Sequence, residues 1–200
     1  MAEVLKLYPD AVPKAKFDKC RRLRDLAEMF RAEFAFNSAI KTYKELAEQK
    51  VKLEMVELAA DKEKELLEEA NKRLEEAERL LASKEASDRR EATKRLLRLK
   101  VGTEGLKEIQ EAQEKVKSLL AKAKEDPETK PLADEGGNYE RAFKEFLKGE
   151  EEFLNGDLQK AYAAYKKVVK SYGRTEFAER AEKRTKEIEE LIKALQEGKK

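Results

Sequence analysis

Four arginines lie close together near the start of the sequence, at Arg21, Arg22, Arg24 and Arg31. A planar guanidinium group forms two parallel hydrogen bonds with one carboxylate, which suits the recognition of an acidic peptide. Their spacing places these arginines on an amphipathic helix predicted for residues 16–33. The alternative is an ordinary solvated helix face, on which Arg24 pairs with Glu28 one turn further along.

A group of phenylalanines marks the last third of the sequence, at Phe143, Phe146, Phe153 and Phe177. Phenylalanines at helical spacing generally form a packed core, and that is the interpretation we favour. The alternative is an apolar groove that binds a partner helix, with Phe143 and Phe146 as the candidate contacts.

The sequence contains no pattern that predicts catalysis. It has no histidine and one cysteine, Cys20, which therefore lacks the partner that a nucleophilic thiol generally requires. Cys20 lies in a helical pattern, so we expect it to be a buried or half-buried apolar residue. Glutamates are numerous, but their spacing matches no calcium loop, and no histidine is available as a metal ligand. We therefore expect a protein that is not an enzyme and holds no metal or cofactor.

Charge is nearly balanced, with 45 basic and 43 acidic residues and a formal net charge of +2. Nucleic-acid-binding proteins generally show a clear basic excess. The densest basic stretch, residues 84–100, has no aromatic residues that would stack on bases, so a solvated helix face is favoured there. No apolar run approaches the roughly 18 residues that cross a membrane. The sequence thus predicts no nucleic-acid partner and no transmembrane segment.

Apolar residues recur at three- and four-residue steps along the sequence, which predicts an all-α protein. Residues 1–50 are expected to hold an antiparallel helical hairpin, because a short turn near residue 35 separates two amphipathic stretches. Residues 51–125 change in character, since leucine or alanine recurs every seven residues at Leu53, Ala60, Leu67, Leu74 and Leu81. This spacing predicts a long charged hairpin of two helices, 51–82 and 88–124, that pack through a narrow coiled-coil-like seam.

The remaining boundaries follow from capping and helix-breaking residues. Asp88 and Glu91 have the spacing of a capping box at the start of the second arm, and Gly102 is a candidate helix end. Residues 126–138 contain two prolines and two glycines and are predicted to be a linker. A second hairpin and a capping helix are expected within residues 139–197.

One pattern occurs twice, in residues 23–46 and again in residues 146–169. In each, an amphipathic stretch and a turn precede a helix with alanine four residues before tyrosine: Ala39 and Tyr43, then Ala161 and Tyr165. Small residues one turn from a tyrosine allow two helices to pack closely. The pattern resembles the tetratricopeptide repeat, a hairpin of helices A and B.

The resemblance rests on particular positions. In the first block they are Leu23, Leu26, Ala27, Phe30, Phe36, Ala39, Tyr43 and Leu46. In the second block they are Gly156, Asp157, Ala161, Tyr165, Val168 and Gly173. Gly149 takes the small-residue position of the second helix A, but the neighbouring core positions hold Glu145, Lys148 and Glu152. Either that turn is one residue short, or the helix is rotated.

The resemblance implies α-solenoid hairpins at both ends of the protein. In the family, helix A lines a concave surface that binds a peptide or a helix, and the matching positions here are Arg21, Arg24, Glu28 and Arg31. Residues 171–184 are also similar to the junctions between repeats in bacterial envelope proteins, such as outer-membrane assembly lipoproteins and Tol-Pal coordinators. This implies a periplasmic or cell-envelope location, and a cytoplasmic location is the alternative because no signal peptide is visible.

We expect a non-catalytic scaffold or adaptor that binds a protein or peptide whose identity the sequence does not give. One alternative is a structural spacer that forms a homo-oligomer through residues 51–124. Another is an accessory segment of a larger protein, because residues 1–12 look like the tail of an earlier repeat. The abundance of Lys, Glu and Arg is typical of a thermophilic source or an engineered sequence.

Overall fold

A computed structural model describes residues 12–197. Every regular element within that range is helical, which confirms the all-α prediction. The elements are α2 (Lys14–Ala32), α3 (Phe36–Ala47), α4 (Glu54–Ala59), α5 (Lys62–Leu81), α6 (Ala86–Gly102), the 3-10 turn η1 (Lys107–Ile109), α7 (Gln110–Glu125), α8 (Lys130–Asp134), α9 (Gly136–Leu154), α10 (Leu158–Ser171) and α11 (Glu176–Glu197). The predicted tail of an earlier repeat falls almost wholly outside the described residues.

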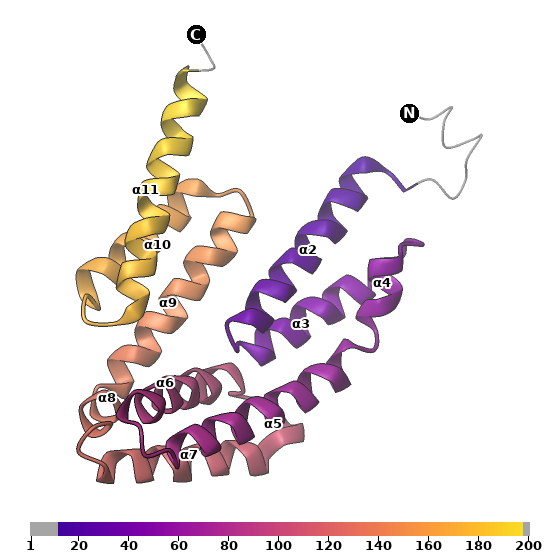
Figure 1. The fold of residues 1–200 in the computed structure, drawn as a ribbon. Helices are drawn as coiled ribbons and strands as arrows, with labels where there is room; N and C mark the ends of the chain where they lie inside the picture. The colour runs from indigo at the N-terminus through magenta and orange to yellow at the C-terminus, as the bar shows by residue number, and fades with distance from the viewer. Residues whose placement is uncertain (1–11, 198–200) are drawn as a thin grey trace.

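The helices form three groups (Figure 1). One side holds the hairpin of α2 and α3 with the short α4 packed on it, and the other holds α9, α10 and α11. Helices α5, α6 and α7 form a layer at the base. The groups join where α3 packs on α5, α6 packs on α9, and α2 packs on α9. The core is therefore continuous from one side of the molecule to the other.

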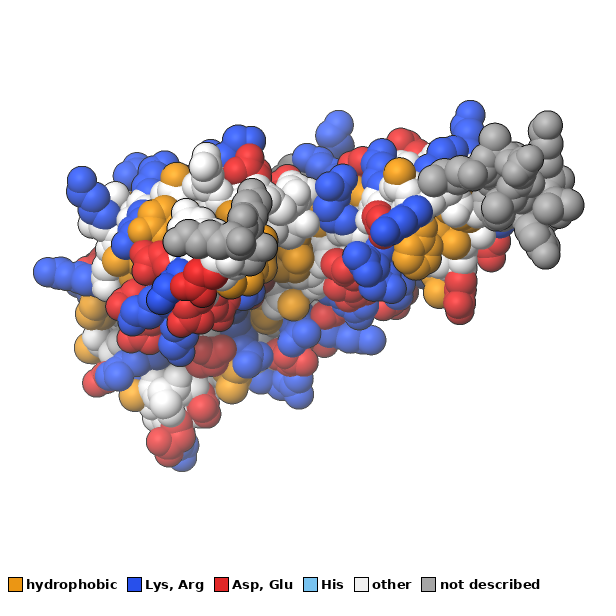
Figure 2. All heavy atoms as spheres, turned by 90° about the horizontal axis from the view of Figure 1, so that it is seen from above, with side chains coloured by type: hydrophobic (Ala, Val, Ile, Leu, Met, Phe, Trp, Pro, Cys, Tyr) orange, Lys and Arg blue, Asp and Glu red, His pale blue; other side chains and the backbone are white. Residues whose placement is uncertain are grey.

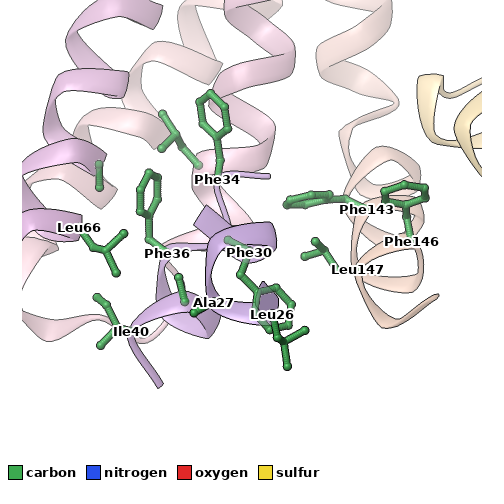
Figure 3. Close-up of a cluster of buried hydrophobic side chains, with 14 of the residues drawn as sticks. Leu26, Ala27, Phe30, Phe34, Phe36, Ile40, Leu66, Phe143, Phe146 and Leu147 are labelled. Atoms are coloured by element: carbon green, nitrogen blue, oxygen red, sulfur yellow. The ribbon is translucent and has the colours of Figure 1, made fainter. Parts of the chain in front are cut away.

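Figure 3 shows where the groups meet. Leu26 and Phe30 of α2 lie on the side that faces Leu147 of α9, and all three side chains are buried. An ion pair closes the same junction, because the Arg180 guanidinium of α11 binds both carboxylate oxygens of Glu33 at the end of α2, with a distance of 3.0 Å from Nη1 to Oε2. Helices that are far apart in sequence are thus held together by apolar contact and by charge.

The predicted arm over residues 51–82 differs from the structure. The chain bends at Ala60 and Asp61, so that α4 and α5 are separate helices. The buried residues of α5 are Leu66, Ala70, Leu74 and Ala77, whereas Ala60 of the predicted seven-residue seam is exposed. Both α3 and α6 pack on α5, so its buried face is wider than the narrow seam of a two-helix hairpin. The regular leucine spacing therefore predicted helical structure correctly, but it did not predict which helices pack on α5.

Two further local predictions are wrong. Helix α6 begins at Ala86, and the Asp88 carboxylate accepts a hydrogen bond from the Ser83 hydroxyl at 2.8 Å, so the predicted capping box does not form. The predicted linker, residues 126–138, is largely helical, with α8 and the first turn of α9. Pro131 is tolerated at the second position of α8, because an amide there has no partner within the helix.

The two ends of the fold share one register. Helix α9 begins and ends 122 residues after α2, and the same shift brings the starts of α10 and α11 onto the starts of α3 and α4. The turns also correspond, since Phe34 and Gly156 have positive φ angles of 66° and 81°. We call α2, α3, α4 and the first turns of α5 the N-terminal unit, and α9, α10 and α11 the C-terminal unit.

Burial follows the same shift of 122 residues. The paired positions that are buried in both units are Ala27 and Gly149, Ala39 and Ala161, Tyr43 and Tyr165, Ala59 and Ala181, and Leu66 and Ile188. In each unit a tyrosine hydroxyl donates a hydrogen bond to a glutamate 15 residues earlier, Tyr43 to Glu28 and Tyr165 to Glu150. The two units are therefore versions of one three-helix arrangement.

This register settles the question about the second block. The two turns have equal length, because α3 and α10 begin four residues after α2 and α9 end. A Cβ atom on Gly149 would lie 2.5 Å from Cε1 of Tyr165, so the tyrosine ring packs directly against the backbone of α9 at this glycine. A shortened turn is thus not needed to explain the position of Phe146. Phe146 faces α11, which buries it.

Candidate functional site

The four polar residues predicted to bind a partner all lie on α2 but have different surroundings. Arg21 and Arg24 are exposed on α2, and Arg24 pairs with its neighbour Asp25 at 2.7 Å rather than with Glu28. Glu28 has a half-exposed carboxylate that accepts the Tyr43 hydroxyl. Arg24 and Glu28 therefore present charge on the surface of the N-terminal unit.

Arg31 instead belongs to an internal ion-pair network. Its guanidinium lies 2.9 Å from Glu65 and 2.6 Å from Glu69, which are both on α5. Burial alone would lower the pKa of Arg31, but the carboxylates of Glu69, Glu65 and Glu28 raise it. The side chain ties α2 to α5, so its charge is already matched within the protein.

Phe143 and Phe146 are core residues, so neither ring is on the surface as a partner-binding residue. The Phe143 ring stacks on Phe177 with centroids 5.2 Å apart, and Phe146 lies 5.6 Å from the same ring. Cys20 is also buried, as predicted, and burial raises the pKa of its thiol. The core interpretation is confirmed for Phe143, Phe146 and Phe177, whereas Phe153 is half-buried at the edge of the core.

The basic stretch of residues 84–100 is used for internal pairing. Arg89 pairs with Asp126, Arg95 with Glu76 and Glu91, and Lys100 with Glu140. Arg98 and Lys94 both reach Glu176 at the start of α11. Figure 2 shows blue and red side chains interspersed over the face that it presents. The basic residues of α6 thus pair within the base layer and, through Lys94, Arg98 and Lys100, with α9 and α11.

A pocket of about 550 Å³ opens on the N-terminal unit between α2, α3 and α4. It brings together Arg24, Glu28 and Tyr43 with apolar residues that lead into α4 or lie on it. Its full lining is Arg24, Glu28, Tyr43, Leu53, Glu54, Met55, Leu58, Ala59 and Lys62. Leu58 is 57% exposed, so this leucine presents apolar surface to solvent at the pocket. We call this hollow the α2–α4 pocket.

In the C-terminal unit, side chains of the protein itself fill the position that corresponds to the α2–α4 pocket. Shifted by 122 residues, Arg24 and Met55 of the α2–α4 pocket correspond to Phe146 and Phe177, whose rings are in contact. Lys62 corresponds to Arg184, which binds both oxygens of Glu150 at 2.8 and 2.9 Å. Smaller or charged residues replace the aromatic ones in the N-terminal unit, and α4 ends after six residues. The pocket is the unfilled counterpart of the C-terminal core.

Sequence reasoning found the α2 side of this pocket and missed the α4 side. The seven-residue spacing places Leu53 in a seam between two long helices, and so it does not predict that Met55 and Leu58 line a surface pocket. The available signal was the repeated unit itself, because the match between residues 54 and 176 appears once the shift of 122 residues is applied to α11.

The residues that the structure describes include neither a candidate metal-binding cluster nor a candidate membrane-spanning helix. Within residues 12–197, no group of three or more Cys, Asp or Glu side chains is arranged to hold a metal ion. Over the same range, no helix has the length and apolar character of a membrane span. The comparisons with protein-family models, curated proteins and solved structures gave no match, so the resemblance to tetratricopeptide repeats stays a prediction.

Proposed function

We propose that this protein is a binding scaffold that holds a peptide or helix of another protein in the α2–α4 pocket. The observation that carries the proposal is the pocket itself, which combines the exposed Leu58 and half-buried apolar side chains with opposite charges. Leu58 and Met55 offer apolar surface, while Arg24 and Glu28 offer one charge of each sign. Apolar pockets with a few polar groups at fixed positions are typical of sites that bind by shape and charge.

The exposed leucine beside the pocket favours a binding function over a purely structural one. A large apolar side chain left exposed beside a hollow costs free energy in water, which an incoming apolar group would recover. The equivalent position in the C-terminal unit is Arg180, which is tied to Glu33. Leu58 has no such internal partner to cover it, since it remains 57% exposed.

A peptide-display selection on the intact protein tests the proposal. Peptides that bind the α2–α4 pocket should lose at least ten-fold in affinity for a Leu58→Glu variant, because the substitution puts a charge at the apolar wall. The matched control is Leu195→Glu on α11, since Leu195 is 58% exposed and does not line the pocket. That variant should bind as the unmodified protein does.

Two results would overturn the proposal. One is a selection that enriches no peptide, and the other is a set of peptides that bind both variants equally well. Circular dichroism of each variant shows whether the helices are intact, so that loss of binding is not confused with loss of fold.

A further inference from the structure

We infer that the α2–α4 pocket accepts a partner segment that presents an aromatic ring and an arginine side chain on one face. This inference rests on the proposed function and adds the chemistry of the partner. It follows from the shift of 122 residues that relates the two units. At the equivalent place in the C-terminal unit, two phenylalanine rings and an arginine side chain are already present within the protein. The two units have the same first and second helices and the same glutamate–tyrosine pair.

The aromatic requirement comes from the missing rings. In the C-terminal unit Phe146 contacts Tyr165 and Phe177, with centroid distances of 5.8 and 5.6 Å. In the N-terminal unit the tyrosine is conserved in place as Tyr43, but Arg24 and Met55 occupy the positions of the two phenylalanines. A ring supplied by a partner would occupy the volume that these substitutions leave open.

Arg24 gives that ring a cation to stack on. In the C-terminal unit the Arg180 guanidinium lies 4.4 Å from the centre of the Phe146 ring. In the N-terminal unit Arg24 stands at the ring position and the apolar Leu58 stands at the cation position. A partner ring between Arg24 and Leu58 would therefore contact both a cation and an apolar group. The neighbouring Asp25 offsets the charge of Arg24, so a basic partner is not repelled.

The arginine requirement comes from the glutamate of each pair. Glu150 is only 5% exposed, and it binds the Tyr165 hydroxyl together with two nitrogens of Arg184. Glu28 binds the Tyr43 hydroxyl, but its nearest cation is Arg31 at 3.9 Å, and Lys62 at the Arg184 position pairs with Glu65 instead. Glu28 thus has an open face where its counterpart holds a guanidinium. A partner arginine matches that face in charge and in geometry.

The test uses the full chain and three blocked helical peptides of about 14 residues, built on alanine and glutamine. The first carries one Phe and one Arg a single turn apart, the second lacks the Phe, and the third has Gln for Arg. We expect the first peptide to bind at least ten-fold more tightly than the second and about five-fold more tightly than the third, measured by fluorescence anisotropy.

Two protein variants test the site. Glu28→Gln keeps an acceptor for Tyr43 but removes the charge, and should weaken the first peptide about five-fold without affecting the third. Its matched control, Glu57→Gln, changes an exposed glutamate of α4 that does not line the pocket, and should change nothing. The triple change Arg24→Phe, Met55→Phe and Lys62→Arg copies the C-terminal residues, and should fill the pocket, raise the melting temperature and abolish binding.

Equal binding of the three peptides, or no effect of Glu28→Gln, would overturn the inference. If the display selection instead yields peptides of other chemistry that depend on Leu58, the proposed function stands and this inference fails. If the display selection finds no peptide that depends on Leu58 and the three designed peptides bind equally, both fail. The single Glu28 variant keeps the test decisive should the triple variant not fold.

Discussion

The carbonyl oxygen of Phe34 lies 1.7 Å from the point where residue 102 would carry a Cβ atom, so only glycine fits there. Phe34 is in the turn between α2 and α3, and Gly102 is the last residue of α6. The turn of the N-terminal unit therefore rests directly on the backbone of the base layer. A backbone neighbour has little freedom to move, unlike the end of a long side chain.

Gly102→Ala should lower the free energy of unfolding by about 3 kcal/mol or more, because the turn and α6 must separate. Gly137→Ala is the control, since a Cβ atom there meets nothing within 4 Å. That change should stabilise α9 by about 0.5–1 kcal/mol, through lower backbone entropy in the unfolded chain. Urea denaturation of both variants measures the difference, and equal stabilities would contradict the close approach of Phe34 to Gly102.

The two arginines of the predicted binding face should behave differently when their charge is reversed. Arg31→Glu places a third carboxylate beside Glu65 and Glu69, and should cost about 2–4 kcal/mol of stability. Arg24→Glu changes an exposed side chain, and should alter stability by about 0.5 kcal/mol or less. Thermal denaturation distinguishes the two, and similar melting temperatures would show that the contacts of Arg31 with α5 are unimportant.

Arg180 and Glu33 should be energetically coupled although 147 residues separate them. A double-mutant cycle with Arg180→Ala and Glu33→Ala should give a coupling energy of about 1–2 kcal/mol, because the pair is charged and doubly hydrogen-bonded. A coupling energy near zero would mean that the apolar contact of α2 with α9 holds the two units together and that the Arg180–Glu33 ion pair adds no stability. Arg174→Ala provides a baseline, since that side chain is 91% exposed and only 3.9 Å from its partner Glu135.

Acid should weaken the contact between α11 and the base layer through Glu176. Its carboxylate accepts a hydrogen bond from the Tyr139 hydroxyl at 2.6 Å and pairs with Arg98 and Lys94. Burial alone would raise the pKa of Glu176, but these three groups outweigh burial and lower the pKa below its ordinary value of 4.5. The contribution to stability is therefore complete above that ordinary value, and is lost as the pH falls through the lowered pKa.

Glu176→Gln isolates this contribution. The variant should be less stable than the unmodified protein at pH 7, because Arg98 loses its partner while buried. The difference between the two proteins should shrink as the pH falls below 4.5 towards about 3, since the unfolded chain takes up a proton at residue 176 more readily than the folded carboxylate with its lowered pKa. Urea midpoints at the two pH values measure it. A difference that is unchanged or larger in acid would contradict the lowered pKa.

Several features of the fold were predictable from local sequence. The spacing of Ala39 and Tyr43, and of Ala161 and Tyr165, predicted two helices that pack closely, and all four side chains are buried. Helical periodicity predicted an all-α protein, and Gly102 ends α6 as expected. These predictions hold because propensity and the period of burial depend on residues within one or two turns of each other.

Other features depended on tertiary packing. The pattern shows that one side of α9 is apolar, but only the contact with α11 decides that Phe146 is covered there rather than exposed. Arg24 and Arg31 are equivalent on a helical projection, yet α5 supplies partners for one and none for the other. The α2–α4 pocket exists because α4 bends away at Ala60, which no local residue pattern announces. Sequence determined which faces of the helices are buried, whereas three-dimensional packing determined what covers them and where a gap remains.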